Sequence, residues 1–174
     1  MTIAVTDACI FIDLIELHLL HLFFQCGWNI HTTREVFHEL YPHQQKKLRI
    51  HQRKGELHIH SLKAVELIEL AEVTYPRSLS HTDCTVIFIA SRLDDALILS
   101  GDRVLRNFAR KISVPCHGTL GIIDRMVTLA LLPKSEGIKS LNRLLQSNII
   151  YQNSRGMRAE IAKRKLAWSS DRSE

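Results

Sequence analysis

The stretch from residue 79 to residue 106 constrains the fold of this chain more than any other. It combines an apolar helix, predicted over 84–93, with a short apolar strand, predicted over 96–99. Asp83 lies in the first turn of the helix, and Asp102 lies just past the end of the strand. A helix that leads directly into a buried strand is typical of α/β folds, in which helices alternate with the strands of a parallel sheet.

The same alternation runs through the rest of the chain and predicts an α/β fold with a mainly parallel sheet. Short apolar runs predict strands over 3–5, 29–31 and 112–116, and an alternating run over 56–60 predicts a half-exposed or edge strand. The remaining patterns predict helices over 10–24, 32–41, 43–54, 62–73, 102–111, 118–132, 135–147 and 155–168. Because no linker or repeat interrupts the chain, we expect one domain over residues 1–150. A basic C-terminal helix and tail over 151–174 would pack on that domain or extend it.

Length and composition agree with one ordinary globular domain. The chain has 174 residues, enough to bury a full core, and is 45% hydrophobic and 24% charged. It has no run of about eighteen apolar residues that would predict a membrane span, and its N-terminus lacks the pattern of a secretory signal. The four cysteines are scattered without a Cys-x-x-Cys spacing, which favours a reduced, cytoplasmic location.

The chain is basic, and its positive charge is unevenly distributed. The formal net charge is +5, which favours polyanionic partners such as RNA through phosphate neutralisation and counterion release. Basic residues are concentrated between residues 42 and 63 and again from residue 154 onward. Solvated helix faces explain these two clusters equally well.

Four acidic residues are placed where a parallel sheet forms its sites. In such sheets, ligands bind beyond the carboxyl ends of the strands, where the strand order reverses. Asp7 and Asp102 each follow a predicted strand, so they meet at one edge if their strands are neighbours at the reversal. Asp83 begins the helix that leads into the Asp102 strand, and Glu39 lies in the helix after the second strand. Either of these two acids can project over the same edge.

A cluster of carboxylates predicts a divalent cation, because like charges repel and a cation offsets that repulsion. Hard oxygen ligands select Mg²⁺ or Mn²⁺. Such an ion can activate a water molecule and neutralise charge on a phosphodiester. Each acid also has a structural alternative. Asp7 and Asp102 can begin helices or occupy turns, Asp83 can form a capping box with Ser80, and Glu39 can be a solvated helix residue.

The chain resembles the PIN-domain family in a series of short motifs. They are Asp7 after the first strand, Val36-x-x-Glu39-Leu40, Leu79-Ser80-x-x-Asp83, Ala90, Leu99-Ser100-Gly101-Asp102-x-x-Leu105-Arg106 and His117-Gly118-Thr119-Leu120-Gly121-Ile122-Ile123. The last of these is similar to a segment common in one prokaryotic branch of the family. The resemblance covers about residues 1–150.

This resemblance implies a three-layer α/β/α fold with a five-stranded, mainly parallel sheet. It also implies a metal-dependent ribonuclease in which Asp7, Glu39, Asp83 and Asp102 are the catalytic and metal-binding residues. Many members are dimeric toxins of toxin–antitoxin pairs (VapC-like), so a homodimer and an antitoxin protein are implied as partners. The chain departs from the family pattern at residues 8 and 9, where Ala8 and Cys9 replace the Ser, Thr or Asn that many members carry.

Several other polar residues have weaker functional interpretations. Ser100 and Thr6 can support the acidic site by hydrogen bonding, whereas Asp124 is expected to be a surface or capping acid. His58 and His60 share one side of a strand and raise a zinc hypothesis. The spacings of a zinc finger are missing, however, so solvated or satisfied histidines are the better interpretation.

The leading hypothesis for function is therefore an endoribonuclease that depends on Mg²⁺ or Mn²⁺. The alternative is a catalytically silent PIN-like domain that binds RNA or a protein partner, and residues 8 and 9 motivate it. A phosphate-ester hydrolase acting on small molecules is a third candidate, which the basic stretches disfavour.

Overall fold

The computed structural model describes residues 2–170, which form two compact units. The first unit comprises residues 2–12 and 27–119, and the second comprises residues 13–26 and 120–170. The division at residue 150 that the sequence suggested falls within the second unit and stays a prediction. No helix of residues 2–170 is both long enough and apolar enough to cross a membrane.

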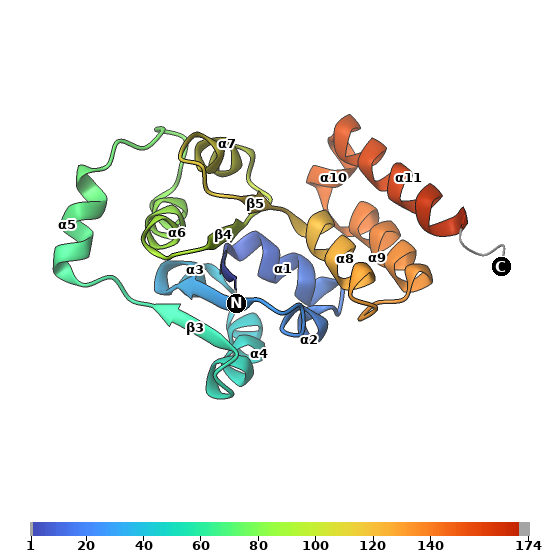
Figure 1. Ribbon diagram of the computed structural model, residues 1–174, viewed down its shortest axis with the longest axis horizontal. Helices are drawn as coiled ribbons and strands as arrows, with labels where there is room; N and C mark the ends of the chain where they lie inside the picture. The colour runs from blue at the N-terminus through green and yellow to red at the C-terminus, as the bar shows by residue number, and fades with distance from the viewer. Residues whose placement is uncertain (1, 171–174) are drawn as a thin grey trace. The chain divides into compact units, whose positions relative to one another are not determined.

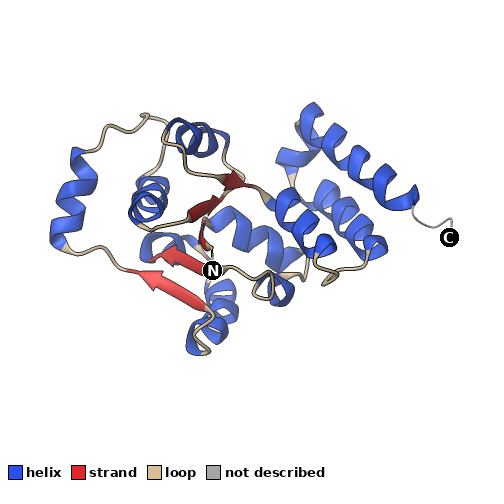
Figure 2. Ribbon diagram, viewed as in Figure 1, coloured by secondary structure: helices blue, strands red, loops and turns tan. Residues whose placement is uncertain are grey.

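The first unit is built on one five-stranded sheet, drawn in red in Figure 2. Its strands are β1 (Ile3–Thr6), β2 (Asn29–Thr33), β3 (Leu57–His60), β4 (Ala96–Leu99) and β5 (Cys116–His117). They are arranged in the order β3-β2-β1-β4-β5, and every pairing is parallel. The strand order therefore reverses between β1 and β4. The predictions of a parallel α/β fold and of an edge position for the 57–60 strand are confirmed.

Helices cover both faces of this sheet, which gives the three-layer α/β/α architecture that the sequence predicted (Figure 1). The helices of the first unit are the start of α1 (Ala8–Glu16), α3 (Arg34–Glu39), α4 (Pro42–Arg53), α5 (Ala64–Glu72), α6 (His81–Arg92) and α7 (Arg103–Lys111). Right-handed crossovers place the start of α1 and the helices that follow β2 on one face, and the helices that precede and follow β4 on the other.

The core of the first unit lies between the sheet and α6. Val5, Ile98 and Leu99 on the two central strands are fully buried, as expected for a parallel sheet covered on both faces. Every residue of α6 from Cys84 to Ala90 is buried, and the helix contacts β1, β2 and β4. The buried middle of α6 thus packs the helix on the sheet, while Asp83 in its first turn stays partly exposed.

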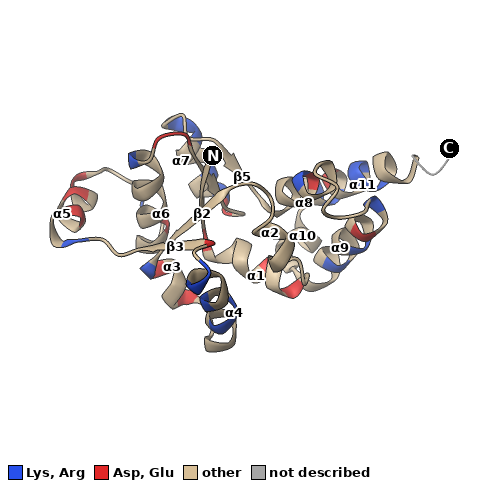
Figure 3. Cartoon of the chain, turned by 60° about the horizontal axis from the view of Figure 1, so that its bottom comes forward, with Lys and Arg blue, Asp and Glu red and all other residues tan. Residues whose placement is uncertain are grey.

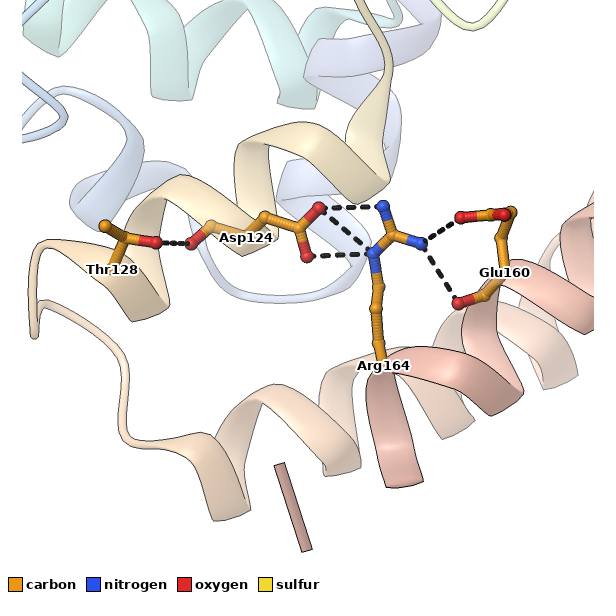
Figure 4. A network of polar contacts seen from close by, with 4 residues as sticks. All are labelled: Asp124, Thr128, Glu160 and Arg164. Atoms are coloured by element: carbon orange, nitrogen blue, oxygen red, sulfur yellow. Dashed lines mark hydrogen bonds and ion pairs between the residues drawn. The ribbon is translucent and has the colours of Figure 1, made fainter. Parts of the chain in front are cut away.

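The second unit is entirely helical. It contains the end of α1, then α2 (Leu20–Phe23), α8 (Thr119–Thr128) apart from its first residue, α9 (Lys134–Ser147), α10 (Ile149–Asn153) and α11 (Arg155–Ser169). The Arg164 guanidinium on α11 donates three hydrogen bonds of 2.7–3.0 Å to the Asp124 carboxylate on α8 (Figure 4). A Cβ on Gly137 of α9 would lie 2.9 Å from the Trp168 ring, so glycine permits the close packing of α9 and α11.

The predicted single helix over 10–24 is wrong, because the chain breaks between α1 and α2. His18 adopts the left-handed conformation with a φ of 59°. Its N–H donates to the Ile15 carbonyl at 3.2 Å, and the Leu19 N–H donates to the Leu14 carbonyl at 2.9 Å. This pair of bonds is the Schellman motif, which normally carries glycine at the left-handed position.

The same motif accounts for two further differences from prediction. Residues 112–114 end α7 instead of forming a strand, because Ser113 has a φ of 60° and the Val114 N–H donates to the Ala109 carbonyl. The α8 helix stops at Thr128 rather than at residue 132, because Ala130 has a φ of 55°. The short helix α10 was not predicted at all.

Candidate functional site

Asp7 lies at the carboxyl end of β1, next to the point where the strand order reverses. Its backbone N–H donates to the Leu99 carbonyl at 3.0 Å, so the residue is still joined to β4. The residue is only 6% exposed. Its carboxylate accepts hydrogen bonds from the Ala8 N–H at 2.5 Å, the Cys9 thiol at 3.3 Å and the Ser100 hydroxyl at 2.8 Å. The fold thus buries a carboxylate at the edge of the sheet and surrounds it with neutral donors.

Ser100 joins the first acid to the last. This fully buried residue follows β4, and its hydroxyl donates to Asp7 Oδ2 while accepting the Asp102 N–H at 3.0 Å. The supporting role predicted for Ser100 therefore has a structural basis. No such contact exists for Thr6, whose buried hydroxyl has no hydrogen-bond partner among residues 2–170.

Asp102 itself is exposed and occupies the N-cap of α7. Its Oδ1 accepts the Leu105 N–H at 2.7 Å, which satisfies one of the free N–H groups at the helix start. The alternative that Asp102 begins a helix is therefore correct as far as its hydrogen bonding is concerned. The N-cap position nevertheless places this carboxylate two residues beyond Ser100, at the same sheet edge as Asp7.

Asp83 also has a capping role. Its carboxylate accepts both the Ser80 N–H at 2.9 Å and the Ser80 hydroxyl at 2.8 Å, and its own N–H donates to Ser80 Oγ at 3.0 Å. The capping box that the sequence suggested is present. Asp83 also lies within electrostatic range of Asp7, because its negative charge contributes to raising the pKa of the Asp7 carboxyl.

Glu39 is the last residue of α3 and is exposed. Among the residues that the structure describes, its carboxylate forms no hydrogen bond or ion pair with the other three acids. The membership of Glu39 in the site stays a prediction.

The electrostatics at Asp7 are unfavourable for a carboxylate. Burial is the main cause that raises its pKa above the usual 3.8, and the charge of Asp83 raises it further, while the Ser100 and Cys9 hydrogen bonds lower it. Within residues 2–170, no Lys, Arg or His forms an ion pair with Asp7, Asp83 or Asp102. Within the described residues, the charges of these three acids are therefore not neutralised by an ion pair.

Cys9 is a part of this site that sequence reasoning missed. Its thiol donates to Asp7 Oδ2 at 3.3 Å, and the Gly101 N–H donates to its sulfur at 3.2 Å. Cys9 thus connects the segment after β1 with the segment after β4, much as Ser100 does. The sequence places Cys9 two residues after Asp7, but a thiol was not expected to act as a donor to that carboxylate.

The donor chemistry fits a hard divalent cation. Carboxylate oxygens are the ligands of Mg²⁺ and Mn²⁺, and a cation beside Asp7 would offset its burial and the repulsion from Asp83. As the side chains stand, no group of three or more His, Cys, Asp or Glu residues within 2–170 is close enough to hold an ion. Mg²⁺ is commonly bound through one or two carboxylates together with waters and substrate phosphates. A closed group of three is therefore not required.

The histidines behind the zinc hypothesis form a cluster that includes a third member, His31. The His31 ring centroid lies 4.8 Å from that of His58 and 4.9 Å from that of His60, and His60 Nε2 is 2.9 Å from His31 Nδ1. Burial lowers the pKa of His31 to about 4, and the charges of His60 and His58 lower it further. Burial also lowers the pKa of His60, so His31 and His60 are packed as neutral imidazoles at neutral pH.

Comparison with known proteins gives one match. A family model described as a PIN domain matches residues 3–163 of the chain. No curated protein matches it.

Proposed function

The chain belongs to the PIN-domain family, and on that premise we propose that it is an endoribonuclease that depends on Mg²⁺ or Mn²⁺. PIN domains are generally nucleases and typically use divalent metals. The proposal adds three points to this general description: that the substrate is RNA, that the bonds cleaved are phosphodiesters, and that the acidic edge between β1 and β4 is the active site.

The observation that carries this proposal is the state of Asp7. A carboxylate that is 6% exposed, lies near Asp83 and has no protein cation as partner is costly to the fold. Such an arrangement is expected where a metal ion supplies the missing positive charge. Perturbed carboxylates of this kind occur preferentially at functional sites.

The four acids have distinct roles in this proposal. Asp7, Asp83 and Asp102 would hold the metal once the Asp83 and Asp102 carboxylates turn from their capping contacts, and Glu39 would either bind it or orient the attacking water. A bound divalent ion lowers the pKa of its water and neutralises charge on the phosphodiester. Ser100 and Cys9 fix the Asp7 carboxylate through the bonds described above, so they act as positioning residues.

Exposed basic side chains support RNA as the substrate. The exposed residues of α4 include Lys46, Lys47, Arg49 and Arg53, and Figure 3 shows basic positions on this helix in blue. These cations can neutralise phosphates without reading the base sequence. Because these cations are spread along a helix, they favour a polyanion over a small phosphate ester.

The test is RNA cleavage by the purified chain with Mg²⁺ or Mn²⁺, followed on end-labelled single-stranded and structured RNA. We expect cleavage that EDTA abolishes and that Asp83→Asn and Asp102→Asn remove. Because both acids cap helices, circular dichroism must establish that the variants remain folded. Activity that survives both substitutions, or that is indifferent to EDTA, would rule this mechanism out.

The alternative of a silent RNA-binding domain is favoured by one observation. Asp83 and Asp102 are already engaged as helix caps. If they cannot turn toward an ion, the chain binds RNA without turnover. Salt-sensitive RNA binding without cleavage under any metal would support the alternative, and demonstrated metal-dependent cleavage would remove it. Generic phosphoester substrates included in the same assay decide the small-molecule hypothesis.

Two finer points rest on the resemblance of sequence motifs alone. We propose that the chain is the toxin of a toxin–antitoxin pair and that it forms a homodimer. Light scattering coupled to gel filtration decides the homodimer, since a monomeric mass at working concentrations contradicts it. Growth arrest on expression that depends on Asp102 decides the toxin role.

A further inference from the structure

A second feature of the first unit is a cleft between α7 and the segment 114–116 that leads into β5. It has a volume of about 240 Å³ and is lined by Arg106, Arg110, Val114, Pro115 and Cys116. At about 30 Å³ per water molecule, it has room for roughly eight waters. The two arginines make this cleft a positively charged pocket in the same unit as the acidic site.

The two arginines are one helical turn apart and have no acid to neutralise them. Neither Arg106 nor Arg110 forms an ion pair among residues 2–170, and the recorded polar contact of Arg110 is with the neutral Asn107 amide at 3.5 Å. Like charges at this spacing destabilise a helix slightly. The negative end of the α7 dipole explains a cation in the last turn, at Arg110, but it does not explain Arg106 in the middle of the helix.

The Arg106 side chain extends toward the segment that follows β5. A Cβ placed on Gly118 would lie 3.7 Å from Arg106 Nη1 and 3.6 Å from the Ser100 carbonyl oxygen. The guanidinium therefore lies close to the backbone that supports Asp7 and Asp102. The charges of Asp7, Arg106 and Arg110 all act on the pKa of the Cys116 thiol, which agrees with this proximity.

Charged residues at regular spacing along α7 lead from the acidic site into the cleft. Asp102 caps the helix, Arg106 follows one turn later, and Arg110 follows after another turn. At a rise of 1.5 Å per residue, each step is about 6 Å. This separation is comparable with the distance between neighbouring phosphates along an extended RNA strand.

We propose that the cleft between α7 and β5 binds a backbone phosphate of RNA next to the phosphodiester at the acidic site, with Arg106 and Arg110 as its cations. This inference rests on the proposed nuclease function and assigns it a substrate-positioning subsite. Guanidinium groups suit the task because their planar fork can bind phosphate through two parallel hydrogen bonds.

The first test measures binding of a fluorescent single-stranded RNA by anisotropy in EDTA, over a series of salt concentrations. We expect Arg106→Gln and Arg110→Gln each to weaken binding roughly tenfold. The double variant should lower the slope of log affinity against log salt by about 0.7, because one phosphate contact on a single strand is lost. Lys111→Gln is the matched control, because Lys111 is exposed on the same helix but does not line the cleft. A double variant with the wild-type slope and affinity would overturn the proposal.

The second test locates the phosphate. Once the cleavage position is mapped, single linkages of the RNA are replaced in turn by neutral methylphosphonates. Neutralising the linkage next to the cleaved bond should weaken binding to the wild-type protein, but should have little further effect on the double variant. Equal losses in both proteins at every linkage would contradict a phosphate in this cleft. Arg106→Lys, which keeps the charge, guards against a folding defect in Arg106→Gln.

The outcomes separate this inference from the proposed function. If RNA is cleaved normally and the arginine variants change neither KM nor the salt slope, the subsite is wrong and the nuclease stands. If RNA binding depends on both arginines but no metal gives cleavage, the cleft stands and the nuclease proposal fails. A free 5′-mononucleotide that competes as strongly as RNA would show a nucleotide site instead, which overturns the RNA assignment.

Discussion

The acids of the two compact units are held in different ways. In the second unit, Asp124 receives three hydrogen bonds from Arg164, whose pKa these bonds raise, and Glu160 binds the same guanidinium at 2.8 Å (Figure 4). In the first unit, Asp7 is more deeply buried, yet its hydrogen-bond donors are an amide, a thiol and a hydroxyl. One carboxylate is neutralised by a fixed cation, and the other is not.

The difference indicates what each acid does. A carboxylate that only joins two helices is best paired with arginine, because the pair fixes the geometry and cancels the charge. A carboxylate that is buried among neutral donors keeps its negative charge available for a ligand, at a cost to the fold. Asp124, expected from sequence to be a surface or capping acid, is a structural acid, and Asp7 has the properties of a functional one.

The sharpest way to break this comparison is to neutralise each acid in turn and measure RNA cleavage. With Mg²⁺ present, we expect Asp7→Asn to lower the initial rate by on the order of 100-fold, because a metal-binding charge is lost. Asp124→Asn should leave the rate within a few-fold of wild type. Comparable losses in both variants would mean that the two acids do not differ in function.

A buried histidine of the first unit and an exposed histidine of the second should differ in how they make stability depend on pH. The pKa of His31 is about 4 in the folded protein, below the usual 6.5. Above pH 6.5 the side chain is neutral in both the folded and the unfolded chain, so burying it costs no deprotonation and stability is highest. This stabilisation is lost as pH falls from 6.5 toward 4, because the unfolded chain takes up the proton first. We expect a loss of about 2 kcal/mol between about pH 7.5 and about pH 5 in urea unfolding. His31→Gln should reduce this slope and leave the part due to His60, whose pKa burial also lowers. His21→Gln, on the surface of the second unit, should retain the full slope.

Breaking the structural pair should destabilise the protein. Asp124→Ala leaves the mostly buried Arg164 without its main partner, and we expect the free energy of unfolding to fall by about 1–2 kcal/mol. Lys139→Ala is the control in the same unit, because the Lys139 and Glu136 side chains are 72% and 49% exposed. That substitution should change stability by less than about 0.5 kcal/mol. Equal effects would mean that the Arg164 fork adds nothing beyond an ordinary surface pair.

Neutralising Asp7 should have the opposite effect on stability. The pKa of Asp7 is raised in the folded protein, so the folded state holds the Asp7 proton more tightly than the unfolded chain does. Asp7 therefore stabilises the fold at low pH, and this stabilisation is lost as pH rises through the folded pKa. At neutral pH without metal, we therefore expect Asp7→Asn to increase stability. The melting temperature in EDTA measures this gain. A decrease would indicate that the three hydrogen bonds to the ionised carboxylate outweigh its burial.

The smallest expected effect concerns Cys9. Cys9→Ser keeps a donor to Asp7 and should retain nearly full activity, whereas Cys9→Ala should lower the cleavage rate by roughly 3- to 10-fold, since one positioning bond is lost. Rates at saturating RNA separate positioning from binding. If Ser and Ala are equivalent at this position, the thiol contributes packing only.

Much of the fold could be predicted because its signals are local. Apolar runs bounded by polar residues identified the strands at the centre of the sheet, and Ser80 was correctly expected to form a capping box with Asp83. Helix ends were less predictable. Gly55, which ends α4, carries the usual glycine signal, but His18, Ser113 and Ala130 adopt the same left-handed conformation without one. At these three positions, packing by the rest of the fold selects the left-handed backbone conformation, which the residues themselves disfavour.

The candidate site likewise has one part that could be predicted from local sequence and one part that could not. Its acidic residues could be identified from the sequence, because an Asp directly after an apolar strand is a local pattern. The partners that set their chemistry could not be named. Cys9 and Ser100 are 91 positions apart in the chain, and nothing local indicates that both donate to one carboxylate. The packing of His31 against His58 and His60 depends in the same way on the register of β2 with β3.

The sequence by itself therefore determined the class of fold, the strands that end in acids and the family to which the chain belongs. Only the tertiary structure decided which acid is buried without a cation, which is paired with arginine, and which basic residues line a cleft beside the site. The physical reason is that strand and helix patterns are set by neighbours along the chain. Charge, burial and pKa are set by neighbours in space, and the strand order that brings β1 beside β4 determines those neighbours.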